Sequence, residues 1–474
     1  MFLLNKYETI ASYLQSVCEQ IRWKKARQAV YQELECHLQD QKDAFLSEGM
    51  QDKEAEQKAI AEMGDAMAVG LALDKAHRPV PQWGLLFLTA MLFLVGMCCR
   101  LFLYDDRTWG EVVPVVGLGI VLFLGAYFLD FSILMRRAKS IVCVTTIILV
   151  LSFLCQTPSI NGKPQFLLFS MTSFALWLPL SYISLLCVLR QKKQHDSWFA
   201  IHGRMGEKCF AISCEGKQFR FWIAIIGYIG GVCFLIPCAL FSNTMIFAIS
   251  AGFALFLAVE QDWFGIGKQK GRKWLMMGVA VILVIGISLF FTRFPYFMYR
   301  LEYFMHRLDN SDPMGNRFLY HLFAGFWQDS QWIGEGIPKS AFLLDIWEVT
   351  NGNWDLSNHS AILLEIGFRY GKVFVGLTLA LFVIFFIKCW LQMRKQKAIL
   401  ANMTAKVIFL ILVLQFLFSV IFQFGIPVLT SFSLPLISWG NTGILLNSIL
   451  IGFLLSVFRT GQECQQWLFS PINK

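Results

Sequence analysis

The stretch Ser311-Asp312-Pro313-Met314-Gly315 lies in a polar and aromatic interval, residues 294–359, that interrupts an otherwise apolar chain. The interval separates two long apolar runs. If those runs cross a bilayer, the interval is the largest segment on its side of the membrane. Chemistry outside the membrane is therefore expected in this interval.

The composition places the chain in the membrane class. Of its 474 residues, 56% are hydrophobic and only 15% are charged, which is too apolar for a soluble protein of ordinary composition. About ten runs have the roughly 20 apolar residues that a membrane-crossing helix needs. They are residues 84–103, 112–135, 140–155, 166–189, 221–240, 244–259, 274–291, 361–387, 407–423 and 442–457. We predict an all-α polytopic membrane protein of about ten transmembrane helices.

The net charge of +9 is grouped rather than spread along one face, so no nucleic-acid partner is predicted. Basic clusters occur at every second loop, as the positive-inside rule requires. They lie within residues 136–139, 190–220, 268–273 and 388–397. We therefore predict that both termini are cytoplasmic and that residues 294–359 lie outside.

Residues 1–81 differ from the rest because they are charged and their apolar residues recur with a helical period. The apolar positions are Tyr7, Ile10, Leu14 and Ile21, then Val30, Leu34, Leu38 and Phe45, then Ala55, Ala59, Ile60 and Met63, and finally Val69 and Leu73. Gly49 is expected to end the second helix, and Asp52 to cap the third. We predict a small cytoplasmic domain of four short helices for assembly or for regulatory docking. It resembles the prefix domain of bacterial permeases and sensors.

Asp312-Pro313-Met314-Gly315 is a turn sequence, and such turns are common in loops. Its surroundings make it a candidate site. Arg300, Arg307 and Arg317 flank it, and Gly334-Glu335-Gly336, Lys339 and Ser340 follow. A carboxylate among cations and glycines suits an anionic, phosphate-bearing substrate.

A second candidate region is the loop before the last apolar run, which ends Leu434-Pro435-Leu436-Ile437-Ser438-Trp439-Gly440-Asn441. Two helices can turn around in a membrane without such a sequence. The prolines and the Ser-Trp-Gly sequence of this loop interrupt the helices, so backbone N–H and C=O groups are left without helical partners. We therefore predict that the loop lines a cavity.

Residues 82–460 resemble the SEDS family, which includes FtsW, RodA and SpoVE, in the number of spans and the large outer loop. Residues 461–474 are then a cytoplasmic tail. Three motifs carry the resemblance: Asp312-Pro313-Met314-Gly315, Gly334-Glu335-Gly336 with Lys339 and Ser340, and Leu434-Pro435-Leu436-Ile437-Ser438-Trp439-Gly440. The family polymerises lipid II into peptidoglycan strands.

The chain departs from the family pattern at several positions. Ser357-Asn358-His359-Ser360 stands where the family has Pro-Glu-x-His-Thr-Asp-Phe, and Phe368-Arg369 replaces an acidic pair. Asn441 replaces a glycine, and Ser242-Asn243-Thr244 retains little of Pro-Asp-x-Gly-Thr. The resemblance therefore indicates a divergent member.

The resemblance implies that a sugar hydroxyl attacks the anomeric carbon of a polyprenyl-linked donor, and that polyprenyl pyrophosphate leaves with inversion. Asp312 is the expected general base, while Arg300, Arg317 and Lys339 are expected to neutralise the pyrophosphate. The remaining substrate-site candidates are Gly334, Gly336, Ser340, His359, Ser438, Trp439 and Gly440. No metal ligands are predicted, although Mg²⁺ or Mn²⁺ could assist the leaving group.

The implied partners are lipid II or a related polyprenyl-linked glycan, membrane lipids and a class B penicillin-binding transpeptidase. The implied location is the bacterial cytoplasmic membrane, in division, elongation or sporulation. Two alternatives remain at this stage. The chain could flip a polyprenyl-linked precursor, or it could be a non-catalytic scaffold for the transpeptidase.

Overall fold

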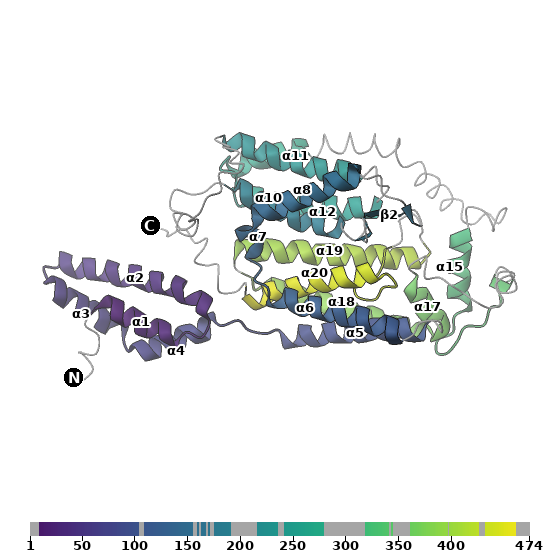
Figure 1. Ribbon diagram of the computed structural model, residues 1–474, viewed down its shortest axis with the longest axis horizontal. Coiled ribbons are helices and arrows are strands. Elements are labelled where there is room, and N and C mark those ends of the chain that lie inside the picture. Colours follow the sequence, from purple (N-terminus) through teal and green to yellow (C-terminus); the bar gives the residue numbers. More distant parts are fainter. Residues whose placement is uncertain are drawn as a thin grey trace. The chain divides into compact units, whose positions relative to one another are not determined.

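The computed structural model (Figure 1) describes residues 9–103, 109–154, 159–160, 163–166, 169–170, 175–190, 216–235, 241–278, 318–340, 343–344, 361–396, 398–425 and 432–460. These residues form two compact units. The first is built on residues 9–82, together with short stretches of 394–402 and 457–460. The second, called here the membrane unit, contains the remaining described residues.

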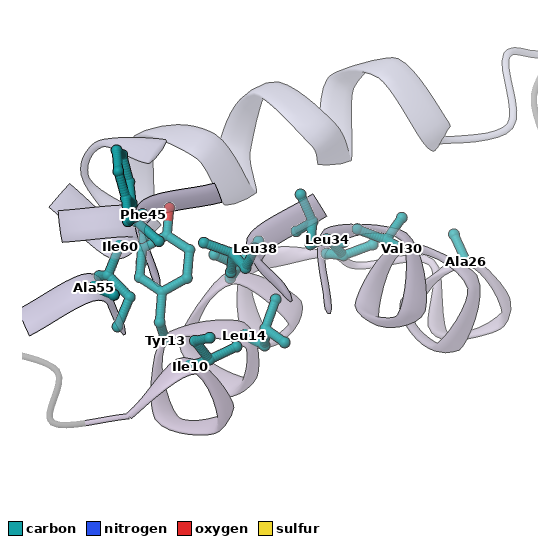
Figure 2. Close-up of a cluster of buried hydrophobic side chains, with 14 residues drawn as sticks. Ile10, Tyr13, Leu14, Ala26, Val30, Leu34, Leu38, Phe45, Ala55 and Ile60 are labelled. Carbon is teal, nitrogen blue, oxygen red and sulfur yellow. The ribbon is translucent and has the colours of Figure 1, made fainter. Parts of the chain in front are cut away.

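The first unit contains four helices, as predicted, although α2 is long rather than short. They are α1 (Ile10–Gln20), α2 (Lys24–Ser47), α3 (Asp52–Met63) and α4 (Ala66–His77). Their predicted apolar stripes meet in one core, in which Tyr13, Leu14, Val30 and Leu38 are fully buried (Figure 2). The 3.6-residue period thus places these side chains on facing sides of the helices.

Residues typical of turns connect these helices, but one predicted cap differs from the structure. Gly49 and Gly64 adopt φ values of 90° and 87° after α2 and α3, a conformation that glycine tolerates best. The prediction that Asp52 caps α3 is wrong, because Gln51 is the N-cap and Asp52 is the first helical residue. Asp52 instead contacts Lys42 at 2.9 Å, and this bond raises the pKa of Lys42. An acid is favourable at either position because both lie at the positive end of the helix dipole.

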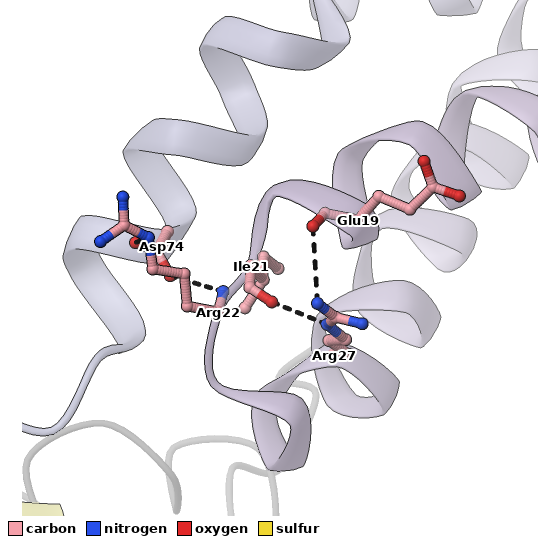
Figure 3. Close-up of polar contacts among 5 residues, drawn as sticks. All are labelled: Glu19, Ile21, Arg22, Arg27 and Asp74. Carbon is pink, nitrogen blue, oxygen red and sulfur yellow. Dashed lines mark hydrogen bonds and ion pairs between the residues drawn. The ribbon is translucent and has the colours of Figure 1, made fainter.

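Polar contacts hold the turn between α1 and α2 (Figure 3). The buried Asp74 of α4 accepts a hydrogen bond from the backbone N–H of Arg22 at 2.8 Å. Arg27 donates to the carbonyl of Ile21 at 2.7 Å. Both acceptors therefore have hydrogen-bond partners. The sharp turn does not bury an unsatisfied polar group, which would be destabilising.

Replacement of Gly70 by Val should loosen this unit. A Cβ at Gly70 would lie 2.7 Å from the Cβ of Gln20 and 2.8 Å from the carbonyl oxygen of Val17. The clash should cost about 1–3 kcal/mol. Hydrogen exchange within the full-length protein should show faster exchange in α1 and α4. The exposed Ala72→Val variant should exchange like the wild type, and equal protection in both variants would contradict the close approach.

The membrane unit is helical and polytopic, which confirms the predicted fold class. Seven of its described helices are long and apolar enough to span a bilayer. They are α5 (Trp83–Phe102), α6 (Trp109–Phe128), α11 (Lys217–Leu235), α12 (Phe241–Glu260), α18 (Lys372–Met393), α19 (Ile399–Gln423) and α20 (Asn441–Thr460). The shorter helices are α7 (Ile133–Arg136), α8 (Ala138–Leu154), α10 (Leu178–Leu189), α15 (Phe318–Asp329) and α17 (Ile362–Arg369).

Two predicted spans are broken in the structure. The run 112–135 ends its helix at Phe128, and the chain turns where the Asp130 carboxylate accepts from the Ser132 N–H at 3.1 Å. The run 361–387 is divided between α17 and α18 by Gly371, whose φ is 110°. Hydropathy averages over such breaks because the flanking residues stay apolar.

The first half of the predicted span 166–189 is not helical. Short strands β1 (Ser159–Ile160), β2 (Lys163–Phe166) and β3 (Phe169–Ser170) pair antiparallel in the order β1-β2-β3. The 3₁₀ turn η1 (Ala175–Trp177) then leads into α10. Ile160 pairs with Lys163, and the intervening Asn161-Gly162 is a sequence typical of two-residue hairpins. Residues 236–240 and 279–291 of two further predicted spans lie outside the described residues.

Candidate active site at one end of the membrane unit

The predicted site residues divide into three groups. Asp312, Arg300, Arg317 and His359 lie outside the described residues. Gly334, Gly336, Lys339 and Ser340 lie in the segment that follows α15, called here the glycine segment (residues 330–340). Ser438, Trp439 and Gly440 lie in the irregular loop between α19 and α20, called here the proline loop (residues 432–440).

Asp329, the last residue of α15, holds the far end of the glycine segment. Its Oδ2 atom accepts from the backbone N–H groups of Lys339 and Ser340 at 2.8 and 3.0 Å, and from the Ser340 hydroxyl at 3.0 Å. Hydrogen bonds to a carboxylate are stronger than neutral ones. The Ser340 hydroxyl therefore anchors the segment, while the Lys339 side chain is exposed.

The two glycines of this segment pack against the end of α17. Gly336 donates to the carbonyl of Phe368 at 2.6 Å, and a Cβ there would lie 2.6 Å from the Phe368 ring. Gly334, with φ 94°, donates to the carbonyl of Tyr370 at 3.0 Å. Both glycines therefore shape the backbone. Phe368, which replaces an acid of the family pattern, serves as the packing surface for Gly336.

The glycine segment also completes the start of α18. The first N–H groups of a helix have no partner within it. The N–H of Lys372 donates to the carbonyl of Gln331 at 2.9 Å, and the N–H of Val373 donates to that of Trp332 at 3.1 Å. The carbonyls of the segment thus cap α18 in place of a side chain.

Helices α15 and α17 pack together against the end of α19 (Figure 1). Their shared core contains Phe323, Phe326, Leu364 and Phe368 from these helices and Phe422 from α19. The Trp327 indole donates to the carbonyl of Gln423 at 2.8 Å, and the Gln423 side chain accepts from the Leu363 N–H at 2.6 Å. The glycine segment therefore follows a helix, α15, that packs against the membrane-spanning helix α19.

The proline loop is fixed to α5 and α19. Leu436 has a φ of 63°, and a Cβ added at Gly96 of α5 would lie 2.5 Å from its carbonyl oxygen. Gln415 of α19 donates to the carbonyl of Ser433 at 2.9 Å. Ser438 is buried, and its hydroxyl accepts from the N–H of Gly440 at 3.1 Å. These contacts hold nonhelical backbone against helices long and apolar enough to span a bilayer, where it is tolerated only if protein or water surrounds it.

Replacement of Gly96 by Ala should displace the proline loop. The added methyl group meets backbone, which cannot swing aside, so we expect a loss of roughly 1–3 kcal/mol of stability. Gly84→Ala in the same helix is the control because a Cβ there has nothing within 4 Å. Thermal unfolding of the purified protein should give a lower midpoint for Gly96→Ala alone. Equal midpoints would rule out the close packing of the loop on α5.

Arg100, near the end of α5, holds part of the candidate site, although no sequence motif points to it. It is only 1% exposed, and it donates to the Asn441 Oδ1 atom at 2.5 Å and to the Trp439 carbonyl at 3.3 Å. A charge inside an apolar run is itself a signal of function. Asn441, which replaces a glycine of the family pattern, provides the acceptor for this arginine.

The end of α5 is shared by both parts of the candidate site. Tyr370 donates its hydroxyl to the carbonyl of Phe102 at 2.8 Å, two residues after the arginine that holds the proline loop. Glu365 of α17 is also buried. The structure therefore brings the glycine segment and the proline loop to the same end of the membrane unit through α5.

Comparison with known proteins identifies the fold. No family model matches the sequence, and no curated protein matches it. Among solved structures, a chain from a peptidoglycan synthase complex that coordinates polymerisation and crosslinking aligns with a TM-score of 0.54. The alignment has 18% identity and covers 81% of this chain and 98% of that chain.

Two structures of the rod shape determining protein RodA from Thermus thermophilus also align. The structure of a point mutant has a TM-score of 0.44 and 14% identity, and the other structure has 0.43 and 15%. Each alignment covers 81% of this chain and 99% of RodA. We assign the fold from the alignment with the chain of the peptidoglycan synthase complex, which has the TM-score of 0.54. The chain therefore shares its polytopic helical fold with that chain of the peptidoglycan synthase complex.

Proposed function

We propose that this protein is a divergent SEDS glycosyltransferase that polymerises lipid II into peptidoglycan strands. One observation carries the proposal. Two segments chosen from sequence motifs alone, residues 334–340 and 434–440, are held at one end of the membrane unit, in a fold shared with a peptidoglycan synthase complex. An unrelated apolar sequence would not be expected both to carry these two motifs and to adopt this fold.

In the proposed reaction, Asp312 removes the proton from the acceptor sugar hydroxyl, which then attacks the anomeric carbon of the donor. The C–O bond to the pyrophosphate breaks, and polyprenyl pyrophosphate departs with inversion. Arg300, Arg317 and the exposed Lys339 neutralise the leaving group. Mg²⁺ or Mn²⁺, if bound to the pyrophosphate, would supply further positive charge.

The described residues contribute positioning. Asp329 bonds to backbone N–H groups of the glycine segment, and Arg100 bonds to a backbone carbonyl of the proline loop, so each segment is anchored by a charged side chain. A site held by such supporting hydrogen bonds keeps its geometry during turnover. His359, Trp439 and Gly440 are proposed to contact the glycan or its lipid.

We further propose that both termini are cytoplasmic, that the candidate site faces outward in the bacterial cytoplasmic membrane, and that a class B penicillin-binding transpeptidase is the partner. The alternation of basic loops supports the orientation. The neighbouring structure is a complex that combines polymerisation with crosslinking, which supports the choice of partner.

The test is a polymerisation assay with purified full-length protein and fluorescent lipid II. A ladder of glycan strands on a gel is the expected result, with and without the transpeptidase. Transfer of lipid II across liposomes without polymer would identify a flippase instead. Absence of both, together with binding of the transpeptidase, would identify a scaffold.

A further inference from the structure

A cavity of about 750 Å³ lies in the membrane unit, away from the candidate active site. It is formed by α11, α12, α18 and α19 and by the helical segment 268–278. The lining is apolar and aromatic, with Tyr228, Phe253, Trp390 and Phe409 among its residues. The Tyr228 hydroxyl is already used, because it donates to the carbonyl of Ala248 at 2.9 Å. The cavity is therefore suited to a hydrocarbon ligand.

The cavity has one charged lining residue among those described, Lys406 of α19. Lys406 lies about 10 Å along α19 from its first residue, Ile399, at roughly 1.5 Å per residue. Ala248 lies at the other end of the lining. It is about 18 Å along α12 from the last residue of that helix, Glu260, at the same rise per residue. The hydrocarbon of one leaflet is about 15 Å thick. The cavity thus extends from Met393, the last residue of α18, across about one leaflet to Ala248, and Lys406 lies between these two ends.

The same surface carries an excess of positive charge. Lys268, Lys270 and Lys273 are exposed on the segment that continues into the cavity lining, and Lys388 is exposed on α18. The nearby acids are engaged. Glu260 contacts the Arg272 guanidinium at 2.5 and 2.6 Å, and Asp262 accepts from the Gly267 N–H at 2.9 Å. An anionic headgroup would be attracted to this surface.

We propose that the cavity binds an anionic phospholipid, with an acyl chain among the aromatic residues and the phosphate within reach of the Lys406 ammonium group. A lysine can bury its methylenes and extend its ammonium group toward the headgroups, so one residue serves both parts of the ligand. The inference does not depend on the proposed glycosyltransferase activity. With the cytoplasmic termini proposed above, the lipid belongs to the inner leaflet.

The proposal can be tested by native mass spectrometry of full-length protein equilibrated with equal amounts of phosphatidylglycerol and phosphatidylethanolamine. The wild type should retain phosphatidylglycerol preferentially. Lys406→Met should lower this retention about fivefold, since a lysine near a membrane surface contributes about 1 kcal/mol to anion binding and this energy corresponds to about fivefold in affinity. The exposed Lys139→Met variant, a charge change outside the cavity, should retain the lipid normally.

A second pair of variants tests the cavity itself. Gly278→Phe should fill it and abolish retention, because a Cβ at Gly278 faces Ile225 at 3.7 Å. Gly125→Phe, where nothing lies within 4 Å of a Cβ, is the control. Equal retention of the two lipids, or normal retention by Gly278→Phe, would overturn the proposal. Co-purified polyprenyl phosphate that phosphatidylglycerol does not displace would show that the assigned lipid is wrong.

Discussion

Replacement of Asp312 by Asn is expected to reduce lipid II polymerisation by about 10²–10⁴-fold, the usual contribution of a positioned general base. A sugar hydroxyl is a weak nucleophile, and an amide cannot accept its proton. The variant should still insert into the membrane, since a turn residue contributes little to the helical frame. The measurement is the rate of strand formation from fluorescent lipid II, normalised to the amount of purified protein.

Asp309→Asn provides the control for this experiment, because it removes an equal charge three residues earlier in the same interval. We expect near wild-type activity from it. Full activity of Asp312→Asn would remove Asp312 from the mechanism. If Asp312→Ala also complements a deletion strain, the scaffold alternative is favoured over the enzyme.

Arg100→Gln is expected to have the largest effect among the described residues. The arginine is buried, and it joins α5 to the proline loop through Asn441 and Trp439. Each hydrogen bond from a charged group contributes about 1.5–3 kcal/mol. Loss of both should lower the thermal midpoint by several degrees and reduce polymerisation at least tenfold, because the loop would no longer be held.

The control is Arg136→Gln. Arg136 is exposed, and its contact with Asp130 spans 3.7 Å, so its loss should cost less than about 1 kcal/mol. Arg100→Lys separates charge from geometry, since lysine keeps the positive charge but lacks the planar guanidinium, one nitrogen of which (Nη2) makes both hydrogen bonds. A wild-type midpoint and rate for Arg100→Gln would refute the anchoring role.

Local sequence patterns predicted much of the fold. The helical period of Leu14, Val30 and Leu38 identified the core of the first unit, because one face of each helix must be apolar. Apolar length identified the membrane helices. Hydropathy could not predict the breaks at Asp130 and Gly371, since a single turn residue barely changes the average over a span.

The candidate site was only partly predictable. The motifs located the glycine segment and the proline loop, but the roles of Asp329 and Arg100 depend on contacts that a sequence does not display. Arg100 and Asn441 are 341 residues apart, so neither residue indicates the other. The pairing of Ile160 with Lys163 had a readable local signal in the intervening Asn-Gly sequence, but the apolar residues that follow favoured a helix prediction instead.

The capping of α18 by the glycine segment has a mechanical consequence. Because Lys372 and Val373 donate to Gln331 and Trp332, the helix end and the segment must shift together or lose these hydrogen bonds. A neighbouring subunit that tilted α18 sideways would therefore transmit strain to Gly334 and Gly336. Such a linkage would let an event within the bilayer adjust the geometry of a site at its edge.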